Sequence, residues 1–238
     1  MKSKALKSLI RKARNELQWP ILERHHDAPV IRIVSDPVHK SHLFLMPDKL
    51  HNRSTDLDYL HELGHAVFCE KVHPVFAATS QFAPRENKRL FLQIVPALNS
   101  ACDWFIGHWQ LTLSPRKARE QLREHLKLAE EVLGEPIVPP LDIILDASLV
   151  IAQAIHYLKE PIVCEGPLKM PVDTFLAIPP EKPSKENCVL LVNGLMATYT
   201  EYRARLVQDG PYYVWDIYRD DESGAQGSEA HEEHGACS

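Results

Sequence analysis

The chain has 238 residues, of which 45% are hydrophobic and 25% charged, and its formal net charge is −5 at pH 7. These are ordinary globular values, sufficient for the core of one domain. The acidic charge is concentrated in residues 220–238, which hold six Asp and Glu and no Lys or Arg, so that residues 1–219 carry +1. A nearly neutral body argues against partners such as nucleic acid or an acidic membrane.

The termini and the cysteines bear on the compartment of the protein. The N-terminus is basic and amphipathic, as a mitochondrial presequence would be, but Lys outnumbers Arg there and Glu16 follows directly. It has no continuous hydrophobic stretch, and no apolar run in the chain reaches the length of a membrane span, so that we expect neither a secretory signal nor a membrane anchor. Five cysteines, odd in number, form no Cys-x-x-Cys pair. We therefore expect reduced thiols and a cytoplasmic protein.

The first third of the chain predicts a helix, two strands and a second helix. Apolar spacing favours a helix over 4–18, and Pro20 ends it. Residues 30–34 and 42–45 are rich in β-branched or large apolar side chains and predict short strands. A second helix is expected to begin at Ser54 or Thr55, where Thr55 and Asp58 resemble a capping box, and to end before Pro74.

The remainder of the chain predicts four further helices. We expect them over 89–113, with a start or kink at Pro96, over 115–133 with Gly134 as C-cap, over 141–159, and over 193–207. Residues 160–183 are expected to form a loop with one strand over 174–178. The sum is a mostly helical α+β domain over 1–219 with a small N-terminal sheet, followed by a disordered acidic tail over 220–238.

His61-Glu62-Leu63-Gly64-His65 is an HExxH motif inside the second predicted helix. At 100° per residue, His61 and His65 point within about 40° of each other and lie one turn apart, so that both imidazoles can reach one ion. Neutral imidazole is a standard ligand of zinc. Glu62 lies beside the first ligand, where a carboxylate can act as general base on a water that zinc makes acidic.

A catalytic zinc site needs a third protein ligand, and Asp103 is the preferred candidate. It is an anionic residue in an almost wholly apolar helical segment, where a metal or a cationic partner would offset the cost of burying its charge. Asn99 lies one turn earlier and could orient a ligand. Asn99, His108 and Glu86 remain alternatives for the third ligand. A position on the helix surface, or a hydrogen bond to a distant Arg, remains an alternative role for Asp103.

These motifs resemble the zincin superfamily of metallopeptidases, and most closely the compact gluzincin-like group that includes the ImmA/IrrE-type bacterial and phage peptidases. In that group, HELGH precedes a helix that bears a Glu ligand and, four residues later, an Asn before Phe-Ala. The matching positions here are Asn99, Asp103, Phe105 and Ile106, so that the Glu is missing. Bacterial putative metallopeptidases with an Asn-x-x-x-Asp helix fit this segment better. The resemblance covers roughly residues 30–110.

The sequence thus predicts a zinc-dependent metallopeptidase that hydrolyses a peptide or protein substrate with Glu62 as base. The alternative is a catalytically weak or inactive zincin-fold binding or regulatory protein, related to phage or stress functions. The resemblance also implies that an extended substrate pairs with the strand at His42–Leu45, as an edge of the sheet. Tyr199, Tyr202 or His108 would then donate a proton to the oxyanion.

Overall fold

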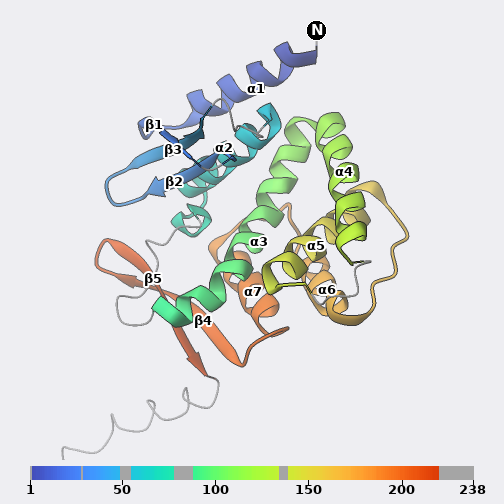
Figure 1. Ribbon diagram of the computed structural model, residues 1–238. Coiled ribbons are helices and arrows are strands. Elements are labelled where there is room, and N and C mark those ends of the chain that lie inside the picture. The colour runs from blue at the N-terminus through green and yellow to red at the C-terminus, as the bar shows by residue number, and fades with distance from the viewer. Residues whose placement is uncertain (1, 28, 49–54, 78–87, 134–138, 220–238) are drawn as a thin grey trace, which may run out of the picture.

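The structure, a computed structural model, describes residues 2–27, 29–48, 55–77, 88–133 and 139–219. It confirms an α+β fold in which helices predominate, with a small sheet near the N-terminus (Figure 1). The helices are α1 (Lys2–Glu16), α2 (Asp56–Lys71), α3 (Lys88–Leu113), α4 (Pro115–Leu133), α5 (Leu141–Gln153), α6 (Lys169–Ala177) and α7 (Lys185–Met196), with the short turns η1 (Pro74–Ala77), the π-helical η3 (Ala154–Leu158) and η4 (Gly166–Leu168). The strands are β1 (Ile21–His26), β2 (Arg32–Asp36), β3 (Ser41–Pro47), β4 (Tyr202–Asp209) and β5 (Tyr212–Arg219). The predicted tail over 220–238 and the C-cap at Gly134 lie outside the described residues.

The N-terminal sheet has the order β1-β3-β2, with β1 parallel and β2 antiparallel to β3. The two predicted strands are present as β2 and β3. The expectation that His42–Leu45 forms an edge is wrong, because these residues lie in β3, the central strand, and β2 is an edge. Strand β1 escaped prediction because it lies at the other edge with four of its six residues exposed, so that its sequence shows no apolar alternation.

Helix α2 begins with the predicted capping box. The Thr55 side chain accepts hydrogen bonds from the backbone of Leu57 and Asp58, and the Asp58 carboxylate accepts one from the Thr55 backbone. Further along the helix, every residue from Leu63 to Cys69 is buried. Helix α2 packs against α1, α3 and β2, which fixes the orientation of the HExxH residues relative to three other elements.

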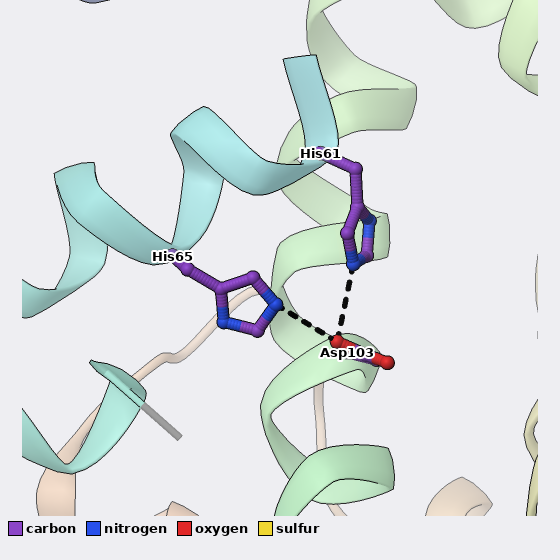
Figure 2. Close-up of side chains that lie close together, drawn as sticks. All are labelled: His61, His65 and Asp103. Atoms are coloured by element: carbon purple, nitrogen blue, oxygen red, sulfur yellow. Dashed lines mark hydrogen bonds and ion pairs between the residues drawn. The ribbon is translucent and has the colours of Figure 1, made fainter. Parts of the chain in front are cut away.

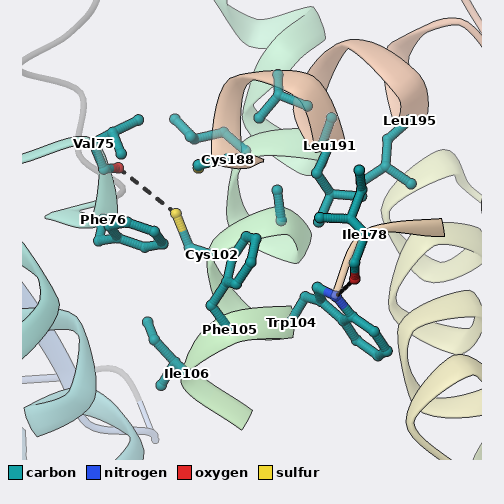
Figure 3. Packing of buried hydrophobic residues seen from close by; sticks show 14 of the residues in the cluster. Val75, Phe76, Cys102, Trp104, Phe105, Ile106, Ile178, Cys188, Leu191 and Leu195 are labelled. Carbon is teal, nitrogen blue, oxygen red and sulfur yellow. Dashed lines mark hydrogen bonds between the residues drawn. The ribbon is translucent and has the colours of Figure 1, made fainter. Parts of the chain in front are cut away.

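Helix α3 runs through the centre of the molecule and contacts α2, α4, α5 and α7 (Figure 1). It begins at Lys88 and continues through Pro96, so that the helix does not start at this proline as one of the two predictions had it. Trp104, Phe105 and Ile106 are fully buried, and the Trp104 indole N–H donates to the Ile178 carbonyl at 2.8 Å (Figure 3). The central helix therefore carries the main core as well as Asp103.

Three predictions for the C-terminal third are wrong. The loop expected over 160–183 contains helix α6, and the strand expected over 174–178 is the end of this helix. The helix expected over 193–207 is the end of α7 followed by strand β4. Strands β4 and β5 form an antiparallel hairpin whose two-residue turn is Gly210-Pro211, with Gly210 at φ +59°. Glycine at the first of two turn residues is a hairpin signal, because this position requires a positive φ. The alternation of buried Ala204 and Leu206 with exposed Arg205 also indicates a strand.

We expected no apolar run long enough to span a membrane, and one described helical stretch differs from this expectation. Leu141–Leu158 is long and apolar enough to do so by length and composition alone. Its α5 part packs against α3, α4 and α6, and the core helices of soluble proteins meet the same criterion.

A buried polar network holds α2 to the sheet and to the segment after α1. Glu70 accepts hydrogen bonds from His42 Nε2 at 2.9 Å, from the backbone N–H of Trp19 at 3.0 Å and from that of Gln18 at 2.8 Å. Ser35 Oγ lies 2.8 Å from His42 Nδ1, so that the hydroxyl donates when Nε2–H donates to Glu70. The Glu70 and His42 side chains are only 5% and 0% exposed. Each of these buried polar groups therefore has its partner.

Replacing Glu70 should destabilise the fold because it leaves three donors without their acceptor. We expect Glu70→Ala to lower the free energy of unfolding by about 2–4 kcal/mol, and Glu70→Gln, which keeps one acceptor oxygen, to lower it by less. Urea unfolding followed by circular dichroism measures both values. Equal losses in the two variants would contradict the role of Glu70 as a shared acceptor.

Candidate metal centre

The structure brings the three predicted metal ligands together. His61 and His65 project from successive turns of α2 toward α3, where Asp103 faces them (Figure 2). Asp103 Oδ1 lies 3.1 Å from His61 Nε2 and 3.2 Å from His65 Nε2. One ligand atom of each residue lies within 4.8 Å of the other two, so that this group could hold a metal ion.

The geometry and chemistry of this group fit a divalent metal. Two ligands placed tetrahedrally at about 2.0–2.1 Å from zinc are about 3.3 Å apart. The two separations of 3.1 and 3.2 Å between the Nε2 atoms and Asp103 Oδ1 are close to that value. Two imidazoles and one carboxylate suit zinc and are also accepted by other divalent transition metals.

A hydrogen bond on the far side of the ring fixes the orientation of His65. Its Nδ1 lies 3.0 Å from the Phe76 carbonyl oxygen in η1, and this oxygen can only accept, so that Nδ1 carries the proton. In the neutral ring, the lone pair of Nε2 then points toward His61 and Asp103. Such a backbone carbonyl behind a metal-binding histidine is a common supporting contact of metal sites.

Charge complementarity holds the group in this arrangement when no metal is bound. Burial disfavours the charged form of His61, but the Asp103 carboxylate outweighs it and raises the pKa of His61 to about 9. Burial likewise works against the Asp103 carboxylate, yet the two imidazoles hold the pKa of Asp103 well below its usual range. Because the same Nε2 atom would bind a metal, metal binding must displace the proton of His61.

Glu62 lies beside the group and contacts the edge of the sheet. Its Oε2 accepts a hydrogen bond from the backbone N–H of Ile33 in β2 at 2.8 Å. Burial raises the pKa of Glu62, although His65 and His61 partly oppose this effect. A carboxylate with a raised pKa beside two candidate metal ligands is suited to accept a proton from water.

The glycine of the HExxH segment allows α2 and α3 to approach closely. A Cβ atom at Gly64 would lie 2.6 Å from Ile106 Cγ2 and 3.1 Å from the ring of Trp109, both on α3. Separations this short require the neighbouring atoms to move. The absence of a side chain at Gly64 therefore supports the spacing that places Asp103 against the two histidines.

The other predicted site residues lie apart from this group. Asn99 is exposed, and His108 Nδ1 lies 2.9 Å from the Tyr157 hydroxyl. Tyr199 donates its hydroxyl to the Gln93 carbonyl. Neither these residues nor Tyr202 line the cavity at the metal group, and Glu86 lies outside the described residues. Asp103 is thus the one predicted third ligand, among those that the structure describes, that reaches the histidine pair.

A cavity of about 330 Å³ opens from His61 and Asp103 between α3, α4 and α5. Two polar side chains that sequence reasoning missed, Asp146 and Gln153, contribute to its lining. A Cβ atom at Gly107 of α3 would lie 2.4 Å from Gln153 Nε2, so that this glycine leaves space for the amide. Both residues belong to a helix of mostly apolar sequence. The only signal that could have identified them is that they are polar residues in this apolar segment.

Comparison of this chain with protein-family models, with curated proteins and with solved structures finds no match. The role of this site is therefore inferred from its geometry.

Removing a ligand should abolish metal binding, because two remaining side chains hold zinc far more weakly than three. We expect about one zinc per chain in the wild type and none in His65→Ala or Asp103→Ala, as measured by mass spectrometry of the purified proteins. Asn99→Ala, one turn from Asp103 but outside the group, should retain zinc. Zinc lost with His65→Ala but kept with Asp103→Ala would place the third ligand elsewhere.

Proposed function

We propose that the protein is a zinc-dependent peptidase of the zincin type. The observation that carries this proposal is the convergence of His61, His65 and Asp103 on one point, with Glu62 beside them and a cavity open to it. Three protein ligands with free space next to them are typical of a catalytic zinc site, whereas structural sites are closed by four protein ligands. A substrate carbonyl group needs this free space to reach the metal.

The residues divide the chemistry between them. His61, His65 and Asp103 would hold a zinc ion, which supplies Lewis acidity that polarises a carbonyl group and lowers the pKa of water. Glu62 takes a proton from the attacking water on its carboxylate and passes it to the nitrogen of the leaving amine. The raised pKa of Glu62 favours both steps, because a carboxylate with a higher pKa is a stronger base.

The edge of the sheet offers a place for the substrate backbone. Strand β2 is an edge strand, and its Ile33 N–H contacts Glu62 directly. A peptide that adds to β2 as a further strand would pass beside Glu62 and the metal group. This assignment replaces β3, which the sequence favoured, because both edges of β3 are already paired.

Replacing the base should separate catalysis from metal binding. We expect zinc-loaded Glu62→Gln to keep its zinc and to cleave an unfolded protein substrate about 10²–10⁴-fold more slowly than the wild type. Cleavage is followed by the release of labelled peptides, and zinc content by mass spectrometry. Glu120→Gln removes an exposed carboxylate on α4 and should cleave at the wild-type rate.

The outcomes distinguish the two functions considered for this fold. Cleavage that survives Glu62→Gln would exclude Glu62 as base. Stoichiometric zinc in a wild-type protein that cleaves no peptide or protein would instead favour a binding or regulatory role.

A further inference from the structure

The cavity beside the metal group has walls that are partly apolar and partly polar, and it can accommodate one long side chain. Its apolar lining includes Leu111 on α3, Leu122 on α4, and Leu149 and Val150 on α5, and His61 and Asp103 also line it. Its volume of about 330 Å³ is at the lower end of the range for ligand pockets. A substrate bound at the metal group would therefore have one of its side chains next to this cavity.

Two carboxylates besides Asp103 line the cavity, and only one of them has unused acceptor atoms. Asp58 Oδ2 accepts from the Thr55 backbone and hydroxyl, and its Oδ1 accepts from Gln121 Nε2 at 2.9 Å. Asp146, on α5, has no hydrogen bond or ion pair to any residue that the structure describes. Its side chain is exposed to solvent, so that the carboxylate is available to a ligand.

The surroundings of Asp146 are negative. Three carboxylates (Asp58, Asp103 and Asp146) and two histidines (His61 and His125) are among the described residues that line the cavity, and no Lys or Arg is. Partial loss of hydration, together with the charges of Asp103 and Asp142, raises the pKa of Asp146 to about 6. The groups that shift this pKa include no cation, so that a cationic ligand would stabilise the ionised form of Asp146.

We propose that this cavity binds the side chain of a lysine or arginine residue of the substrate, next to the bond that is cleaved. The aliphatic part of such a side chain packs against Leu122, Leu149 and Val150, and its charged end reaches Asp146. This inference rests on the proposed peptidase function and adds to it a substrate class, namely peptides with a basic residue at the scissile bond.

Amino-acid hydroxamates test the cavity without requiring turnover. The hydroxamate group chelates zinc, and the side chain samples the adjoining space. Lysine hydroxamate and norleucine hydroxamate have side chains of the same length that differ in the terminal charge. We expect the zinc-loaded wild type to bind lysine hydroxamate at least about tenfold more tightly, as measured by isothermal titration calorimetry.

Two matched variants on α5 identify the group responsible. In Asp146→Asn, the preference for lysine over norleucine hydroxamate should fall to about twofold or less, while norleucine hydroxamate binds as before. Asp142→Asn removes an exposed carboxylate one turn earlier that does not line the cavity, and should retain the preference. Zinc content and melting temperature verify that both variants are loaded and folded.

Three outcomes would overturn the proposal. Equal binding of the two hydroxamates by the wild type would exclude a cation-selective cavity and leave the metal centre intact. An equal loss of preference in both variants would show that the overall charge of α5, and not a contact with Asp146, is responsible. Failure of the zinc-loaded protein to bind either hydroxamate would show a closed metal site and overturn the peptidase proposal as well.

Discussion

Asp103 lies on a helix whose next three residues, Trp104, Phe105 and Ile106, are fully buried. A carboxylate in such a position loses much of its hydration, which costs several kcal/mol when no partner compensates. His61 and His65 provide that compensation from α2, at 3.1 and 3.2 Å. A polar contact therefore joins the two central helices, and the two separations between Asp103 and the histidine nitrogens are already close to those of a zinc site.

The opposite end of the HExxH helix is held by a second polar contact. Glu70 joins α2 to β3 through His42 and to the backbone after α1, while Glu62 joins it to β2 through Ile33. Helix α2 is thus fixed to the sheet at two points eight residues apart, and to α3 between them. Such a rigid mounting is what a metal site needs if its ligands are to remain at a fixed separation.

The sequence predicted those parts of the fold that depend on local signals. The capping box at Thr55, the helical face shared by His61 and His65, and the isolated charge of Asp103 all follow from spacing and polarity along the chain. Strand β1 left no such signal because it is mostly exposed, and its pairing partner β3 lies fifteen or more residues away. The position of β3 at the centre of the sheet likewise depends on pairing between separate segments.

The candidate site shows the same division. The ligands share one helix and one apolar segment, so that the sequence could identify them, although it left Asn99, His108 and Glu86 open. The cavity is formed by α3, α4 and α5 together, and only the packing of these helices brings Asp146 and Gln153 near Asp103. The long loop predicted over 160–183 contains helix α6, which the prolines in that stretch obscured. Sequence signals located the chemistry, whereas tertiary packing determined what surrounds it.

Gly64 has a consequence for how this kind of site is recognised in other chains. The pattern His-Glu-x-x-His treats its two middle positions as free to vary, but here the second of them sits against Ile106 and Trp109 of the neighbouring helix. A homologous chain could keep every chemically active side chain, acquire a larger residue at this position, and lose the convergence of the histidines with the aspartate. The residue before the second histidine and the helix that it contacts therefore determine together whether the two histidines and the aspartate can converge.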